Sequence, residues 1–581
     1  MKVLNCEGTM GKGLVKIDYI LCGFLALAFT ASPQYIKNGN CSIDGVYVLS
    51  AITFFIVLLG VNIVVRKSIS LYYQNRLDNQ SDISLFCDRF FASRKSLLKT
   101  ALVILICWLP VLIALYPGTF INDTWGQLQQ FMVFTDGGQL HRKVLSNHHP
   151  FFDTLLMGGF IIPWVKLTDA WHAVIFVYVL IQSFITSLTF AYSVIYVYKK
   201  LKIGRAASIG ILAFYCIMPM YATSVQTVSK DALFSWIYVL FFVFFMEIVR
   251  TNGDVLKDKP FFVKFLLTVV FCIVTKKVGF YIIGASILIL YKSNLVNKRK
   301  IGISLVVAFC MMSIVLPLTK YALGVHSGGI QEMFSIPFQQ TARYIKYHPN
   351  DITPDEKVVI DKVLNFTDLA ERYDPLSADP VKGYSQRGHT KDYLIYLKTW
   401  IAQGVRHPGT YIDGFNAMVS GWFSFYEYKP LMDMEWHSQL DPKKIPEWVP
   451  ERNDFFKWTS STYEKAYDIA YHNPFITVFL CYGFYASLIP AFMLATVFRS
   501  HRRVSIKYWL VAVPMVLSIG LGCWLAPVSI HFEGRRYLYP IIYTTPLIIA
   551  WCLFFYKNEE DETKQCLDMQ HKEADDVVRR K

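Results

Sequence analysis

The stretch AVIFVYVLIQSFITSLTFAYSVIYVY occupies residues 173–198 and contains no charged side chain. A second apolar stretch, VYVLSAITFFIVLLGVNIVV, occupies residues 46–65. An α-helix needs about 20 apolar residues to cross a hydrocarbon core of about 30 Å, so each stretch predicts a membrane-spanning helix. Two such stretches in one chain predict a protein that crosses the membrane several times.

The composition of the chain agrees with this prediction. Of its 581 residues, 54% are hydrophobic and 17% are charged, and the charged share is below the roughly 25% usual in soluble proteins. The net charge of +15 would suit nucleic acid, but Lys and Arg in cytoplasmic loops explain the same excess in a membrane protein. We therefore expect no nucleic-acid partner. The twelve Cys residues show no CxxC or Cys/His metal spacing.

Twelve membrane spans are predicted. Cytoplasmic loops favour Lys and Arg, and all strongly basic loops share one side only if residues 151–167 do not cross. That stretch, FFDTLLMGGFIIPWVKL, is short and contains Asp153 and Pro163, which favours a helix lying in the outer interface. Both termini are then cytoplasmic, whereas thirteen spans would leave the basic residues 199–205 outside. The predicted spans lie near residues 15–32, 47–65, 98–116, 171–198, 206–222, 232–249, 261–275, 279–291, 301–319, 474–498, 507–527 and 537–557.

The predicted fold class is therefore an all-α polytopic membrane protein of the cell membrane with about twelve transmembrane helices. The polar segment 320–473 lacks a long apolar run, and we expect it to form a small, mainly helical extracytoplasmic domain. The predicted parts are an N-terminal two-helix segment with a cytoplasmic loop (1–97), a membrane core (98–319) with an outer loop (117–170), the extracytoplasmic domain (320–473), C-terminal membrane helices (474–557) and a cytoplasmic tail (558–581).

Two stretches of the extracytoplasmic segment predict helices. In TPDEKVVIDKVL, Thr353 and Glu356 are spaced as a capping box, and a Pro stands at the first helical position. DYLIYLKTWIAQG predicts a helix that Gly404 can end. Its predicted packed face consists of Leu394, Leu397, Trp400 and Ile401.

The stretch FINDTWGQLQQFMVF (120–134) follows the third predicted span. Asp123 is either an ordinary helix cap or the working carboxylate of an active site at the membrane face. Asn122 or Thr124 can also cap, so the two roles need not exclude each other.

The stretch SNHHPFF places His148 and His149 on the same predicted outer loop. Paired histidines can bind a metal or donate hydrogen bonds to a phosphate, and His-Pro before an apolar helix can equally be only a helix start. No third ligand stands at a metal-binding spacing, so no metal site is predicted.

Three further short stretches carry charges toward the predicted outer face. Ion pairing, interfacial lysines and interfacial anchoring are the structural alternatives for them, but charges at membrane depth are costly and are usually functional. Gathered cations suit a phosphate or pyrophosphate headgroup, and a carboxylate beside them suits a general base. The residues are Lys230 and Asp231 in VSKDALF, Lys276 and Lys277 in TKKVGF, and Arg535 and Arg536 in EGRRYLYP.

A lipid phosphate sugar is a substrate of this shape, with its chain in the bilayer and its sugar outside. Basic residues can neutralise the departing phosphate where soluble enzymes often use a metal. A divalent cation such as Mg²⁺ or Mn²⁺ remains an open alternative.

These residues also resemble a family. An apolar span, the Asp of PGTFINDTWGQ and then NHHPFF resemble the start of GT-C-fold membrane glycosyltransferases, which use polyprenyl-phosphate sugars. The ordered set SKDALF, TKKVGFY, SIPFQQTARYI, YDPLSADPVK and GRRYLYP resembles a bacterial family of uncharacterised multi-pass proteins with this fold. The resemblance covers roughly residues 100–550.

The resemblance implies roles for single residues. Asp123 matches the acid implied to be the catalytic base, and His148 and His149 match a His-Pro element near the donor. Lys276 and Lys277 stand where relatives tend to have Arg and Asn before Gly, which keeps one positive charge but departs from the family pattern.

Gln339, Gln340 and Arg343 match a motif of the extracytoplasmic segment, which could line an acceptor cleft or join that segment to the membrane. The leading hypothesis is an inverting hexosyltransferase that moves a sugar to a glycan, lipid or protein acceptor. A lipid-linked oligosaccharide flippase is the first alternative, although it would place polar groups at mid-depth in repeated halves, and no repeat is visible. A non-catalytic scaffold for envelope assembly is the second.

Overall fold

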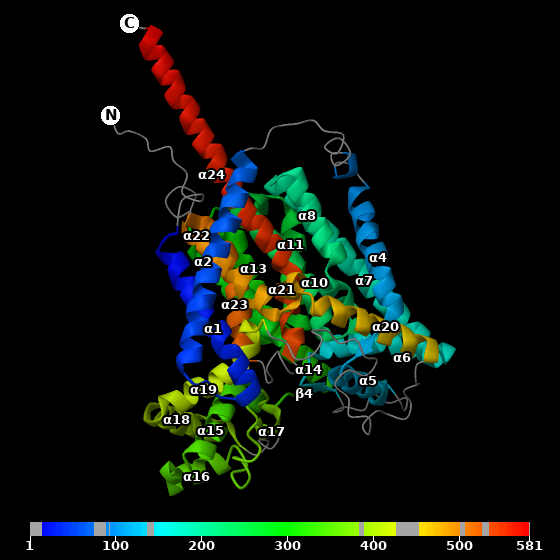
Figure 1. Cartoon of the computed structure of the whole chain (residues 1–581). Coiled ribbons are helices and arrows are strands. Elements are labelled where there is room, and N and C mark those ends of the chain that lie inside the picture. Colours follow the sequence, from blue (N-terminus) through cyan, green and yellow to red (C-terminus); the bar gives the residue numbers. More distant parts are fainter. Residues whose placement is uncertain are drawn as a thin grey trace.

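The computed structural model describes residues 14–74, 89–135 except 92 and 94, 145–382, 388–425, 453–499, 506–525 and 534–579. This part of the chain is almost entirely helical (Figure 1). It contains nine helices that are long and apolar enough to cross a membrane, or up to eleven spans if each of two bent helix pairs counts as one. The expectation of an all-α polytopic membrane protein is thereby confirmed.

Most of the long helices run roughly parallel to one another (Figure 1). The helices are α1 (Lys16–Asn38), α2 (Gly45–Gln74), α4 (Ser96–Ala114), α6 (Phe151–Thr168), α7 (Trp171–Tyr196) with η1 (Val197–Leu201), α10 (Lys230–Arg250), α13 (Lys298–Cys310) with η3 (Met311–Val315) and α14 (Leu316–Leu323), η10 (Ile506–Val511) with α23 (Ala512–Leu525), and α24 (Tyr539–Arg579). Lys298–Leu323 counts as one span made of three consecutive helical parts. The span Tyr508–Leu525 begins within η10, and the span Arg536–Asn558 begins within η11 (Gly534–Leu538), just before α24.

Two further apolar segments are bent. α8 (Arg205–Ile217) meets α9 (Pro219–Val225) at 51°, because the residue before a proline is disfavoured in helical geometry and Met218 is extended. α21 (Pro474–Leu480) meets η8 (Phe484–Leu488) and α22 (Ile489–Arg499) at 63°.

α11 (Lys259–Thr275) and α12 (Lys277–Lys292) form a tight helical hairpin. Its turn is the single residue Lys276, which is extended with φ −149° and ψ 125°. A Cβ atom at Gly279 would lie 2.3 Å from the carbonyl oxygen of Cys272. Glycine therefore permits the close return of the second helix.

α5 (Asn122–Thr135) packs on α6, and α6 lies crosswise to α4 (Figure 1). Gly158 in α6 faces Phe131 in α5 so closely that a Cβ atom at position 158 would lie 2.3 Å from Cγ of Phe131. Gln127 Nε2 adds a hydrogen bond to Thr154 Oγ1 at 3.0 Å. α5 and α6 therefore form one unit at the end of the bundle.

Two short parallel ladders join loops that are distant in sequence. β1 (Thr119–Phe120) pairs with β3 (Thr227–Val228), and β2 (Ser146–Asn147) pairs with β4 (His326–Ser327). Gly118 precedes β1 with φ +125°, and a Cβ atom there would lie 2.9 Å from the backbone oxygen of Gln226. The ladders fix the segments that follow α4, α9 and α14.

A helical domain lies at one end of the bundle, which we call the domain end (Figure 1). It has a hydrophobic core of its own, which includes Phe338, Leu364 and Tyr396. Its elements are η4 (Ile330–Phe334), α15 (Ser335–Tyr347), η5 (Pro349–Asp351), α16 (Pro354–Asp361), α17 (Asp379–Lys382), α18 (Thr390–Arg406), α19 (Pro408–Val419) and η6 (Ser420–Phe423).

The segment 320–473 is not one unit. α20 (Asp454–Tyr471) packs against the end of α4, where Thr459 and Ser460 each donate a side-chain hydrogen bond to the carbonyl of Ala114, at 3.0 and 3.1 Å. This last helix therefore belongs with the membrane helices rather than with the domain core.

The local helix predictions were partly right. The capping box at Thr353 and Glu356 is present at the start of α16. The predicted packed face of α18 was right in part, because Trp400 packs against the domain core but Leu394 and Ile401 are exposed while Tyr393 is buried. Gly404 also does not end α18, which continues to Arg406.

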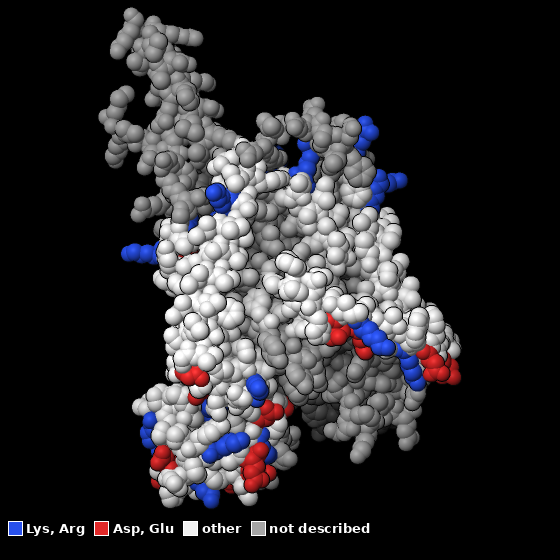
Figure 2. Space-filling view, viewed as in Figure 1, with Lys and Arg blue, Asp and Glu red and all other residues white. Residues whose placement is uncertain are grey.

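The visible surface in Figure 2 has three zones. Lys and Arg gather at the end opposite the domain, and a broad middle zone shows almost no charge. Both signs are mixed over the domain and in a band at the lower right, where Figure 1 labels α20. An uncharged zone of this kind is what a lipid-facing surface requires.

Candidate active site

The β1–β3 ladder brings the start of α5 beside the start of α10. Thr124, in the first turn of α5, donates a hydrogen bond to the backbone oxygen of Val228. Ser229 then caps α10 by accepting a hydrogen bond from the backbone nitrogen of Ala232 at 3.2 Å. These contacts fix the positions of the neighbouring residues, Asp123 before Thr124 and Lys230 after Ser229.

Asp123 lies among three partners rather than acting as an isolated cap. Its Oδ2 is 2.5 Å from Nζ of Lys230 and 3.1 Å from Nη2 of Arg536. Its Oδ1 is 3.6 Å from Nε2 of His149. The side chain is 17% exposed, so the carboxylate is mostly enclosed but still open to one side.

Asp231 is a second carboxylate, and it is fully buried. Its Oδ1 is 2.8 Å from Nζ of Lys276, and its Oδ2 is 3.6 Å from Nε of Arg536. Arg536 therefore contacts both carboxylates. Tyr537 and Phe234 surround Lys276, with ring centroids 5.5 and 5.2 Å from its Nζ, as in a cation–π contact.

We call this group the charge cluster. It combines three cationic side chains and two carboxylates with one histidine, so it carries an excess of one positive charge when the histidine is neutral. Its members are Asp123, His149, Lys230, Asp231, Lys276 and Arg536.

The pKa of Asp123 is set by opposing effects. Burial raises it, but the charges of Arg536 and Lys230 act in the other direction, and the net pKa lies well below the ordinary value. Asp123 is therefore ionised and, in this arrangement, a weak base.

The ring of His149 is neutral. Burial, and then the charge of Lys230, lower its pKa well below the ordinary value. Nζ of Lys230 lies 2.8 Å from Nδ1, and because an ammonium only donates, Nδ1 must accept. The ring proton then sits on Nε2, the nitrogen that faces Asp123.

Asp153 lies near this site, which the sequence did not predict. It lies in α6, is fully buried, and neither of its carboxyl oxygens has a hydrogen-bond partner among the described residues. It is close enough to interact electrostatically with Lys230, Asp231 and Lys276. The sequence signal that could have indicated this position is a lone carboxylate in an apolar helix. From the sequence alone, it served only as evidence that the helix lies in the interface.

Some predicted site residues lie beside the cluster. His148 is 47% exposed, with its Nδ1 3.7 Å from Oε1 of Glu332. Lys277 is exposed and its Nζ lies beside Gly328, just after β4. Of the two adjacent lysines, only Lys276 turns into the cluster.

Arg343 lies elsewhere, at the junction of the domain with the α1–α2 turn. It is buried, and its Nη1 donates hydrogen bonds to the backbone oxygen of Gly39 at 2.9 Å and to the hydroxyl of Tyr373 at 3.0 Å. Its Nη2 is 3.3 Å from Oδ2 of Asp413. These contacts match the second expected role, joining the domain to the membrane helices. The side chains of Asn122 and Arg535 lie outside the described residues.

Comparison with known proteins gives one family. Residues 48–567 match the model of a family of unknown function (DUF6020). No curated protein and no solved structure matches the chain. Because the match covers far more than half of the sequence, the chain belongs to this family.

Proposed function

We propose that this member of the DUF6020 family is an inverting membrane glycosyltransferase of GT-C-like fold. It moves a sugar from a polyprenyl phosphate to a glycan, lipid or protein acceptor on the outer face of the cell membrane. The observation that carries this proposal is the enclosed carboxylate of Asp123, held beside Lys230 and Arg536 at the domain end of an apolar helix bundle.

The proposed orientation places the domain and the charge cluster outside and both termini in the cytoplasm. Lys and Arg gather at the end opposite the domain in Figure 2, and cytoplasmic loops are the ones enriched in these residues. Twelve spans result if both bent pairs, α11 and α12 cross the membrane and α6 lies in the outer interface. The crosswise direction of α6 in Figure 1 supports that last assignment.

The excess positive charge of the cluster matches the proposed donor. A sugar joined to a polyprenyl monophosphate carries one negative charge, whereas a pyrophosphate carries more. Lys230 also begins α10, and the N-terminus of a long helix favours an anion. A monophosphate donor held by Lys230 and Arg536 would therefore complete the charge balance.

Donor binding would also activate the base. Lys230 and Arg536 are the two cations that most lower the pKa of Asp123. A phosphate that pairs with both would weaken their interaction with Asp123 and so raise the pKa of this carboxylate. Asp123 then accepts the proton of the acceptor hydroxyl while the acceptor oxygen bonds to the anomeric carbon. The bond from that carbon to the phosphate oxygen breaks, the phosphate keeps the electron pair, and the anomeric configuration inverts.

The test is a transfer assay with purified full-length protein in detergent. Radiolabelled polyprenyl-phosphate sugars are offered with envelope acceptors, with EDTA or with Mn²⁺ added. Asp123→Asn should lose transfer, whereas the matched control Asp454→Asn should keep it, because Asp454 is fully exposed on α20. Equal transfer by Asp123→Asn would refute the assignment of the base. Lipid translocation in vesicles without transfer would favour a flippase instead.

A further inference from the structure

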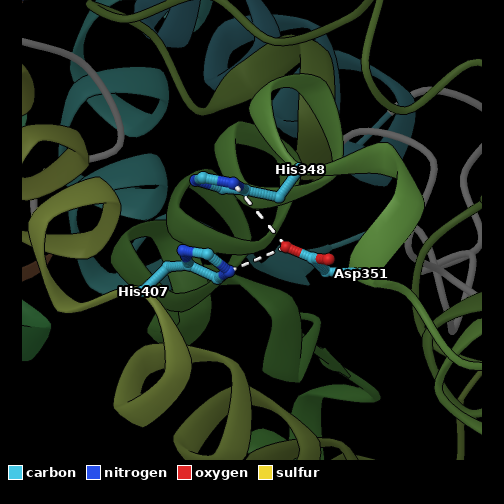
Figure 3. Close-up of side chains that lie close together, drawn as sticks. All are labelled: His348, Asp351 and His407. Atoms are coloured by element: carbon cyan, nitrogen blue, oxygen red, sulfur yellow. Dashed lines mark hydrogen bonds and ion pairs between the residues drawn. The ribbon is translucent and has the colours of Figure 1, made fainter.

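Two His-Pro dipeptides of the domain have nearly the same backbone conformation. His348 follows α15 with φ −132° and ψ 54°, and His407 joins α18 to α19 with φ −131° and ψ 70°. Their rings stack with centroids 3.7 Å apart and planes 19° from parallel. Figure 3 shows both rings facing Asp351, a residue of η5.

Ligand atoms of the three side chains lie close to one another. Nε2 of His407 is 2.9 Å, and Nδ1 of His348 is 3.9 Å, from the same carboxylate oxygen of Asp351. One ligand atom from each residue lies within 4.8 Å of the others. A proton shared between a histidine and the carboxylate could hold such a cluster without a metal. The choice between a proton and a metal therefore depends on the types of ligand and on the groups that contact them.

The group behind His348 favours a metal. Its Nε2 lies 2.8 Å from Oγ1 of Thr410, and when Nε2 donates to that hydroxyl, the lone pair of Nδ1 faces Asp351. Metal-binding histidines are typically oriented in this way by a hydrogen bond from the other ring nitrogen. On the other side, Arg406 contacts the backbone oxygen of Asp351 and the carboxylate of Glu356, so its charge is offset and directed away from the ligand oxygen.

We propose that His348, Asp351 and His407 bind a divalent transition metal ion, with Zn²⁺ as the best-matched class. Two imidazole nitrogens and one carboxylate suit Zn²⁺ and its neighbours in the transition series, whereas Mg²⁺ and Ca²⁺ prefer oxygen ligands throughout. Water would complete the coordination. The site shares no residue with the charge cluster, so this inference does not depend on the proposed glycosyl transfer.

Metal binding requires one ring to leave the stack. An imidazole binds a metal in its own plane at about 2.0–2.1 Å, and two nearly parallel rings cannot both do so from their present positions. The side chains of His348 and His407 are 27% and 31% exposed, so solvent lies beside both rings. Each ring also contacts the buried ring of Tyr344. The bound ion would tie the end of α15 to the turn between α18 and α19.

Zinc binding to tag-free, EDTA-treated full-length protein tests this site. The wild type should bind one Zn²⁺ per chain by calorimetry and elemental analysis, and Zn²⁺ should raise its melting temperature. Cobalt substitution should give visible absorption bands. His348→Phe with His407→Phe keeps an aromatic stack but removes both nitrogen ligands. It should weaken binding by at least about 100-fold, the upper end of what the loss of a group behind a ligand costs.

Two controls make the outcome decisive. Asp351→Asn removes the charged ligand with little change in side-chain size, and it should also weaken Zn²⁺ binding. His472→Ala removes another His–Asp pair, in which Nδ1 of His472 is 3.5 Å from Oδ1 of Asp468, and should leave binding unchanged. Wild-type protein that binds no Zn²⁺, Co²⁺ or Ni²⁺ would overturn the proposal, as would undiminished binding in the double Phe variant.

Discussion

The ammonium of Lys230 lies 2.5 Å from the carboxylate of Asp123, although 107 positions separate the two residues in the chain. Each residue alone has an ordinary explanation, a helix cap for Asp123 and an ion pair with the adjacent Asp231 for Lys230. Their contact is produced by the β1–β3 ladder, which joins segments that follow different membrane helices. The contact turns two local features into one enclosed site.

Arg536→Lys should weaken donor binding even though it keeps the charge. Arg536 contacts both Asp123 and Asp231, and a lysine is a point charge that cannot reproduce the planar fork of a guanidinium. We expect the KM for a polyprenyl-phosphate sugar to rise about tenfold, which corresponds to about 1.4 kcal/mol. Arg250→Lys, which alters an Arg–Glu pair at the other end of α10, is the matched control and should leave KM unchanged.

The stability of the protein should fall as the pH drops below the ordinary pKa of histidine. The pKa of His149 is lowered by burial and by Lys230. Below about pH 6.5 the side chain of His149 is therefore protonated in the unfolded chain but not in the folded protein. The stability is retained above that pH and is lost below it. Melting temperatures between about pH 7.5 and 5 should fall less for His149→Gln than for the wild type; parallel curves would contradict the assignment.

Replacing Asp153 by Leu should stabilise the protein. A buried polar group without a hydrogen-bond partner costs about 1–3 kcal/mol, and Asp153 is such a group among the described residues. We expect a higher melting temperature for Asp153→Leu and little change for Asp153→Asn. A loss of transfer in both variants, with stability retained, would show that the carboxyl group serves the reaction. A large fall in melting temperature would instead reveal a structural partner.

Arg343→Ala should destabilise the protein without changing its chemistry. The substitution leaves the backbone oxygen of Gly39 and the partly exposed carboxylate of Asp413 without their guanidinium partner. The loss of hydrogen bonds to a buried charged group costs about 1.5–3 kcal/mol. The melting temperature should fall, while the KM for donor and acceptor in the surviving folded fraction should stay the same. A changed acceptor KM at unchanged melting temperature would return Arg343 to a substrate-binding role.

The features that could be predicted from sequence are those with local causes. The capping box at Thr353 depends on residues within one helical turn, and the apolar stretch at 173–198 needs only its own length to predict a span. The full packed face of α18 could not be predicted, because the burial of Tyr393 depends on its packing against other helices. In the same way, the sequence cannot tell Lys276 from Lys277, since the turn of the α11–α12 hairpin decides which one faces Asp231.

The buried state of Asp153 was also beyond reach. A single carboxylate in an apolar helix predicts either an interface or a functional group, and only the packing of α5 on α6 separates a solvated side chain from an enclosed one. The position of α20 shows the same limit, because its contact with Ala114 depends on where α4 ends.

The glycine at position 158 has a consequence for the whole of α5. Phe131 lies directly on it, and Phe131 belongs to the same helix as Asp123. A methyl group at position 158 would act as a wedge that lifts this helix and carries its first turn away from Lys230. The ring of Phe131 thus sets the spacing between α5 and α6 at this point.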